Sequence, residues 1–156
     1  MIRLAKPWIG EDEQRAVAAV LESGQLVQGQ LVERFELAVA AFVGRKHAVA
    51  VSSGTAALQL ALKLLQVGPG DDVLCPALSW PSPAHVARAA GAKVRFVDID
   101  PDEWNSGPEA FREARSDATK VAIVIDQFGN PARAAQISEA LGSLPIIEDA
   151  ACALGS

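Results

Sequence analysis

Short runs of branched apolar residues that alternate with helical segments constrain the fold of this chain most. The alternation predicts five strands, over residues 48–51, 73–75, 93–97, 121–125 and 145–148. Helices are predicted between them, over residues 56–65, 83–90, 108–115 and 132–141. The strands are rich in Val and Ile and lack polar alternation, which is typical of strands buried on both faces. We therefore predict an α/β domain with a mostly parallel sheet and helices on both faces.

The first 44 residues show only helical patterns. One amphipathic helix is expected to begin at the acidic residues 11–13 and to end at Gly24, and a second carries Phe35 and Phe42 on one face and ends before Gly44. We predict an N-terminal helical arm over residues 1–44 and an α/β domain over residues 45–156. The helix over residues 56–65 is apolar nearly all round, so we expect it to be buried.

Composition excludes several classes of function. Half of the 156 residues are hydrophobic, which is enough for a core, and 14 basic against 19 acidic residues give a net charge of −5. Such a chain has no excess positive field for nucleic acid or an anionic membrane. Cys75 and Cys152 are too few for a disulfide framework, and His47 and His85 lack ligand-spaced neighbours, so no metal site is expected. No apolar run is long enough for a signal peptide or a membrane span, and we expect a cytoplasmic protein.

Ser53, Gly54 and Thr55 stand where a predicted strand gives way to a helix. The free N–H groups at a helix N-terminus bind anions, Gly54 permits close approach, and the Thr55 hydroxyl adds a donor. These residues therefore predict a phosphate site. The alternative is a plain helix N-cap made by Ser or Thr, which taken alone is the commoner arrangement.

Two further side chains follow predicted strands. Asp149 ends the last strand, where a carboxylate points into the region in which α/β proteins bind ligands, although it could equally cap a following helix. Trp80 follows the second strand and could stack on a flat ligand, although a single Trp more often lies in a core. A phosphate site, an aromatic platform and a carboxylate together suit pyridoxal 5′-phosphate (PLP), a phosphorylated ring that is protonated on nitrogen.

The order of short motifs along the chain resembles the sugar aminotransferases of the DegT/DnrJ/EryC1/StrS type, which are fold type I PLP enzymes. The blocks that carry the resemblance are residues 6–10, 53–58, 70–73, 96–99, 128–132 and 148–151. The resemblance implies that Gly54 and Thr55 hold the cofactor phosphate, that Trp80 stacks on the pyridine ring, and that Asp149 pairs with the pyridinium nitrogen. It also implies a reaction that moves an amino group, usually from glutamate, to a keto group on a nucleotide-linked sugar.

The chain departs from the family pattern at four points. Cys152 replaces a Gln that orients the cofactor's phenolic oxygen, Asp126 replaces a common His, and Asn130 replaces the usual Gln. The Schiff-base lysine of the family lies downstream of the Asp, and none of the lysines present matches its motif, so we assign no catalytic residue to this chain. In the fold type I sheet two later strands also separate the strand over residues 48–51 from the one that ends at Asp149. We therefore expect only the N-terminal part of the PLP-binding large domain, poorly folded and inactive alone.

Three functions remain open at this point. The first is part of a PLP-dependent sugar aminotransferase, with a nucleotide sugar and an amino donor as substrates and a homodimer or complementing chain as partner. The second is a non-enzymatic pseudo-transferase module that dimerises with a full-length aminotransferase. The third, a small nucleotide-binding α/β protein, lacks any glycine fingerprint for phosphate and ranks last.

Overall fold

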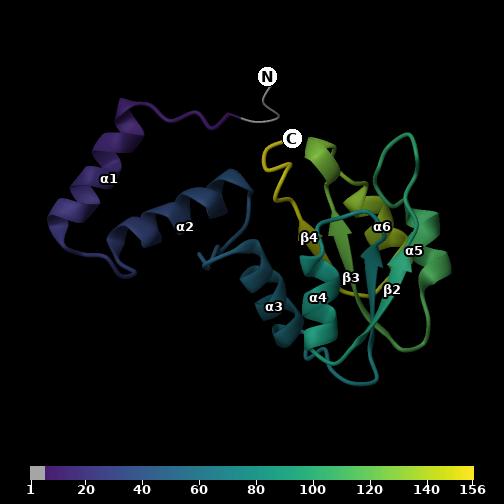
Figure 1. Ribbon diagram of the computed structural model, residues 1–156. Coiled ribbons are helices and arrows are strands. Elements are labelled where there is room, and N and C mark those ends of the chain that lie inside the picture. The colour runs from purple at the N-terminus through teal and green to yellow at the C-terminus, as the bar shows by residue number, and fades with distance from the viewer. Residues whose placement is uncertain (1–5) are drawn as a thin grey trace. The chain divides into compact units, whose positions relative to one another are not determined.

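The computed structural model describes residues 6–156 and divides into two compact units (Figure 1). One unit ends at Ala50, and the other is Val51–Ser156. Residues 1–5, the start of the predicted arm and of the segment searched for a signal peptide, lie outside the described residues. The predicted division after residue 44 stays a prediction, because compactness alone does not define an independently folding domain.

Two helices make up the first unit. Helix α1 (Glu11–Ser23) has three acidic residues in its first turn, and the amide of Gly10 donates to Glu13 Oε2 at 2.6 Å, which satisfies one free amide at the helix start. Helix α2 (Gln30–Phe42) follows Gly29. Its Glu36 carboxylate accepts the amide of Ala50 at 2.7 Å. Both predicted helices of the arm are confirmed.

The second unit alternates helices and strands around one sheet. Its elements in chain order are α3 (Gly54–Leu64), β1 (Asp72–Pro76), α4 (Ser82–Ala89), β2 (Lys93–Val97), α5 (Pro108–Ala114), β3 (Thr119–Ile125), the short 3₁₀ helix η1 (Gln127–Gly129), α6 (Ala134–Leu141) and β4 (Ile146–Asp149). The strand order is β2-β1-β3-β4, and each neighbouring pair is parallel. The predicted α/β class with a parallel sheet is confirmed.

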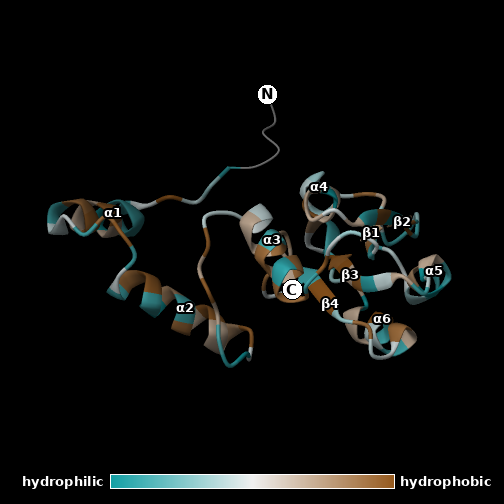
Figure 2. Ribbon diagram, turned by 90° about the horizontal axis from the view of Figure 1, so that it is seen from below, coloured by the Kyte–Doolittle hydropathy of each residue, from teal (hydrophilic) through white to brown (hydrophobic). Residues whose placement is uncertain are grey.

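Helices cover both faces of this sheet, as predicted. Leu58 and Leu62 of α3 and Val86 of α4 pack on one face, against alternate residues of the central strands such as Val73 and Ile123. On the other face, α5 and α6 pack against the intervening residues; this second core consists of Leu74, Val97, Phe111, Ala122, Val124, Ile137 and Leu141. Figure 2 shows the hydrophobic strands β3 and β4 between α3 on one side and α6 on the other. Every described side-chain N or O atom that is fully buried has a hydrogen-bond partner.

Two predictions about this region are wrong. Residues 48–51 form no strand: Val49 and Val51 are exposed, and neither outer strand of the sheet pairs with them. Branched residues favour a strand only when a neighbouring strand offers backbone partners, and within residues 6–156 this segment has none. Helix α3 is not buried all round either, since Leu60 and Leu64 are exposed and only Leu58 and Leu62 are fully buried.

The search for a helix long and apolar enough to cross a bilayer found none within residues 6–156.

Candidate functional site

The connections of the sheet diverge between β1 and β3. The chain leaves β1 toward α4 on one face, and it leaves β3 toward α6 on the opposite face. In a parallel α/β sheet, the loops that part in this way open a crevice at the carboxyl ends of the two strands, and ligands bind there. The topology of the sheet therefore predicts a ligand site at the loops after β1, β3 and β4.

Ile125 and Asp149 lie side by side at the carboxyl edge, on the face that α3 and α4 cover, and Cys75 of β1 shares that face. Ile125 belongs to the core of that face, and Asp149 pairs with it in register, so the two side chains point the same way. Cys75 lies two residues beyond Val73 of the same core and shares its direction. Burial and, secondarily, the negative charge of Asp149 raise the pKa of Cys75 to about 12. The carboxylate and the thiol are therefore close enough to interact electrostatically.

Asp149 is half-buried at the end of β4. Its Oδ1 accepts the amide of Ala151 at 3.2 Å, inside a turn that occupies residues 151–155. A turn and not a helix follows it within residues 150–156, and the alternative interpretation of Asp149 as a helix N-cap stays a prediction. Its second carboxylate oxygen receives no hydrogen bond from residues 6–156, which leaves one acceptor free for a ligand.

The N-terminus of α3 lies at the same edge and on the same face. Helices α3 and α4 lie side by side and run opposite to the strands, so their first turns lie at the carboxyl end of the sheet (Figure 1). Ser53 caps α3: its Oγ accepts the amide of Ala56 and its carbonyl accepts that of Ala57, both at 3.1 Å. The amides of Gly54 and Thr55 find no acceptor among the described residues. Ser53 is thus the structural cap, while Gly54 and Thr55 keep the donors that an anion needs.

Gly54 and Thr55 are both exposed, and a Cβ added at Gly54 would meet no atom within 4 Å. An anion can therefore approach the first turn without displacing protein atoms. The α3 dipole adds a partial positive charge at the same point.

Trp80 lies in the loop after β1 and is 79% exposed, so the alternative of a core Trp is wrong. The ring lines a small hollow of about 270 Å³ together with His85, Arg88 and Phe96, which come from α4 and β2. The start of its loop is tied to the sheet, because the amide of Ala77 donates to the carbonyl of Val97 at 2.8 Å.

The residues that depart from the family pattern have separate roles in the structure. Cys152 is exposed in the turn after β4, and its carbonyl oxygen lies 3.4 Å from where a Cβ on Gly129 would stand. Asp126 is buried, and its Oδ1 accepts the amide of Ala132 at 2.8 Å. Asn130 donates from Nδ2 to the carbonyl of Glu103 at 2.9 Å. Asp126 and Asn130 thus hold the loop after β3.

Sequence reasoning missed Gln127 and Asn105. The amide nitrogen of Gln127 donates to the carbonyl of Leu78 at 3.0 Å, and the side chain of Asn105 accepts the backbone N–H of Gln127 at 3.0 Å. Neither residue stands in a spacing that predicts a role, because the bonds join loops that are far apart in the chain.

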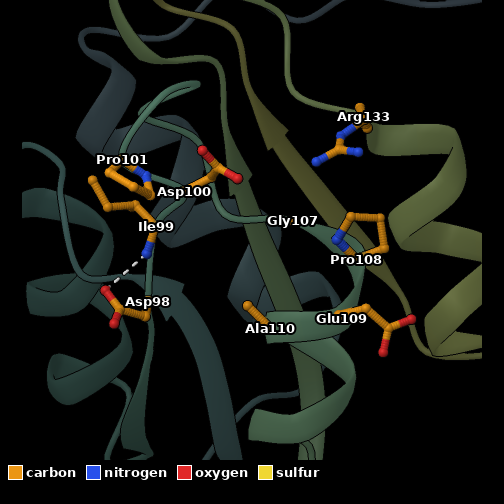
Figure 3. Close-up of a pocket in the computed structure, with 9 residues that line it drawn as sticks. All are labelled: Asp98, Ile99, Asp100, Pro101, Gly107, Pro108, Glu109, Ala110 and Arg133. Carbon is orange, nitrogen blue, oxygen red and sulfur yellow. Dashed lines mark hydrogen bonds between the residues drawn. The ribbon is translucent and has the colours of Figure 1, made fainter.

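A separate hollow of about 550 Å³ lies beside the start of α5 (Figure 3). Its lining comes from the loop after β2, from Gly107 to Ala110, and from Arg133 ahead of α6. The Oδ1 of Asp98 there accepts the amide of Ile99 at 2.9 Å, and Arg133 pairs with Glu103 at 3.0 Å. None of the predicted site residues lines this hollow. Among residues 6–156, no group of three or more His, Cys, Asp and Glu side chains could hold a metal ion.

The lysines of the second unit lie far from this edge. Lys63 is in the last turn of α3, whereas Ser53 is at its start. Lys93 begins β2, and Lys120 is the second residue of β3, so both lie toward the amino ends of the strands. No lysine of Val51–Ser156 stands at the carboxyl edge.

Two free amides at a helix start, a free carboxylate oxygen and an exposed Trp thus lie at one edge of a fold that also matches a known family. The family model for the DegT/DnrJ/EryC1/StrS aminotransferases matches residues 7–156. The chain belongs to this family. The structure resembles DesV of S. venezuelae, solved in complex with a ketimine intermediate, at 35% identity and a TM-score of 0.88 over 93% of this chain and 40% of DesV.

Two further solved structures are similar to this chain over most of its length. One is 3-amino-5-hydroxybenzoic acid synthase, at 38% identity and a TM-score of 0.88, over 97% of this chain and 40% of the synthase. The other is GDP-4-keto-6-deoxymannose-3-dehydratase with a trapped PLP-glutamate geminal diamine, at 31% identity and a TM-score of 0.92, over 99% of this chain and 42% of the dehydratase. The chain therefore spans about two fifths of the length of these solved relatives, and its fold is that of their PLP-dependent class.

Proposed function

We propose that this chain forms part of a PLP-dependent aminotransferase that acts on a nucleotide-linked keto-sugar with a glutamate-type amino donor. Family membership and the PLP named for a solved relative support the reaction class. One observation carries the proposal: the free amides of Gly54 and Thr55 and the free oxygen of Asp149 lie on one face of the sheet at its carboxyl edge.

The residues at this edge fit PLP in type and order. The amides of Gly54 and Thr55, with the Thr55 hydroxyl, would bind the phosphate. Asp149 would hold a proton on the pyridine nitrogen, because its free oxygen accepts a hydrogen bond best from a cationic N–H. Trp80 would stack on the ring, and the Cys152 thiol would be a weak partner for the phenolic oxygen. PLP itself supplies an electron sink for bonds at the substrate's α-carbon.

We further propose that none of the chain's own lysines supplies the Schiff-base amine. Lys63, Lys93 and Lys120 lie at the wrong end of the sheet to reach a ring held between Gly54 and Asp149. The remaining two, Lys6 and Lys46, belong to the first unit, and neither matches the motif of the family's lysine. The chain alone would then bind PLP without transaminating, and a homodimer or a complementing chain would supply the amine. The division into an arm over residues 1–44 and a cofactor domain over residues 45–156, and a cytoplasmic location, belong to the same proposal.

Equilibrium binding tests the cofactor assignment. The wild-type chain is titrated with PLP and, separately, with pyridoxal, which lacks the phosphate, and Trp fluorescence is followed. We expect saturable binding that is tighter for PLP, and a loss of about ten- to a hundredfold in PLP affinity for Asp149→Asn, the range for one charge-assisted hydrogen bond. Thr55→Val should weaken PLP and leave pyridoxal unchanged. Equal affinities for the two compounds, or no effect of Asp149→Asn, would contradict the proposal.

The placement of the lysines also favours the second candidate, a non-enzymatic module that pairs with a full-length aminotransferase. Borohydride reduction of the PLP-loaded chain followed by peptide mapping distinguishes the two proposals from a self-sufficient enzyme. Stoichiometric label on one lysine of this chain would contradict both. Recovery of amino-group transfer on adding the remainder of a family enzyme favours the aminotransferase, and tight association without any activity favours the module.

A further inference from the structure

The loop that carries Trp80 is held at two points before the ring. The amide of Ala77 donates to the carbonyl of Val97, and the carbonyl of Leu78 accepts Gln127 Nε2 at 3.0 Å. The Trp80 indole is exposed and makes no hydrogen bond to residues 6–156. No hydrogen bond of the ring therefore fixes its position, which depends mainly on the backbone of its loop.

Gln127 is held rigidly enough to direct this bond. Its backbone N–H donates to Asn105 Oδ1 at 3.0 Å, and Asn105 Nδ2 donates to the carbonyl of Asn130 at 2.9 Å. Asn105 is only 4% exposed, so both ends of η1 are tied to a buried side chain. Polar groups buried in this way keep their partners, because a buried polar group without a partner destabilises the fold.

These bonds link three loops at the carboxyl edge. Asn105 follows β2, Gln127 follows β3, and Leu78 follows β1. The bond from Gln127 to Leu78 joins the loop after β3 to the loop after β1. These two loops diverge to opposite faces of the sheet, and the crevice between them borders the proposed cofactor edge. A side chain that crosses at this point fixes the separation of the two loops that border the crevice.

We infer that Gln127 is a positioning residue that sets the place of the Trp80 ring through the carbonyl of Leu78. The benefit of this positioning rests on the proposed function, because a Trp80 ring that is already in place loses less conformational entropy when it stacks on a ligand. The bond itself is a property of the unliganded chain and can be tested without any ligand.

The test uses Trp80 as the only tryptophan, in a background with Trp8→Phe and Trp104→Phe. Gln127→Leu removes the donor at nearly constant volume. Gln136→Leu is the matched control, because Gln136 is exposed on α6 and its side chain makes no hydrogen bond within the described chain. Fluorescence anisotropy of Trp80 is measured without ligand, and affinity for PLP is measured by quenching, with circular dichroism to verify the fold.

We expect Gln127→Leu to lower Trp80 anisotropy and to weaken PLP by about three- to tenfold, the range for one lost hydrogen bond, while Gln136→Leu changes neither. Anisotropy equal to that of Gln136→Leu would overturn the inference. Lower anisotropy in a background that does not bind PLP would leave the positioning role standing and refute the proposed function.

A second variant keeps the inference falsifiable if Gln127→Leu fails to fold. In Gln127→Glu the ionised carboxylate repels the Leu78 carbonyl, whereas the protonated acid can donate to it. Trp80 anisotropy of Gln127→Glu should therefore rise toward the parent value as the pH falls from about 7.5 to about 4.5, and the parent should show no such rise. Identical pH profiles for the two proteins would overturn the inference, because a purely structural defect would not recover on protonation.

Discussion

The thiol of Cys75 should make the stability of this chain depend on pH in the alkaline range. Burial and the charge of Asp149 raise the pKa of Cys75 from 9.0 to about 12. The folded pKa lies above the unfolded one, so the unfolded chain releases its proton first. Stability is therefore complete below about pH 9 and falls as the pH rises toward about 12.

The size of the effect follows from the two pKa values. At about pH 10 the unfolded thiol is mostly ionised and the folded thiol is not, which removes about 1.4 kcal/mol of unfolding free energy relative to about pH 8. Other groups also titrate over this range. The Cys75→Ala variant lacks this thiol and reports their contribution, so the difference between the two proteins isolates Cys75.

Urea unfolding of the wild type, Cys75→Ala and Cys152→Ala at the two pH values measures this difference. The wild type and Cys152→Ala should each lose about 1.4 kcal/mol more than Cys75→Ala between about pH 8 and about pH 10. Equal losses in all three proteins would refute the burial that raises the pKa of the Cys75 thiol. The same curves test the expectation that the chain folds poorly alone. A broad, non-cooperative transition would support that expectation, and a single steep transition would contradict it.

Three substitutions test other parts of the second unit by urea unfolding. Asp126→Ala removes a buried acceptor of the Ala132 amide and should cost about 1–3 kcal/mol, whereas Asp126→Asn keeps an oxygen there and should cost less. Ser53→Ala removes the N-cap of α3, which holds the Ala56 amide, and should cost about 1 kcal/mol, while Ser53→Asp should retain the cap. Phe111→Ala leaves a cavity in the core beneath α5 and should cost about 3–5 kcal/mol. A cost below about 0.5 kcal/mol for any of the three alanine variants would contradict the packing or bonding described for that site.

The sequence predicted the sheet well where the pattern is local. Lys93–Val97 forms a strand with the predicted bounds, and the other strands and the α-helices from Gly54 onward lie within two residues of their predicted ends. The 3₁₀ helix η1 was not predicted. In these strands and α-helices a run of apolar residues is bounded by turn residues a few positions away, and the helices and strands of the structure keep those boundaries. The strand predicted over residues 48–51 failed because strand formation depends on a partner that local sequence does not reveal.

The hydrogen bonds that hold the loops around the candidate site could not be predicted from the sequence, whereas the places of its residues in the fold could. The amides of Gly54 and Thr55 and the carboxylate of Asp149 follow from their places at a helix start and a strand end. The bonds from Gln127 and Asn105 could not be predicted, because they join loops separated by 22 and 49 residues. Only the three-dimensional order of the strands brings those loops together.

The central claim is that the start of α3 and the end of β4 form one cofactor site. Heteronuclear NMR of the wild-type chain, titrated with PLP, tests it most directly. We predict that the backbone amides of Gly54 and Thr55 and those next to Asp149 shift together with one dissociation constant, and that pyridoxal leaves Gly54 and Thr55 in place. Shifts confined to the regions around Lys63, Lys93 and Lys120, with Gly54, Thr55 and Asp149 unchanged, would contradict the claim.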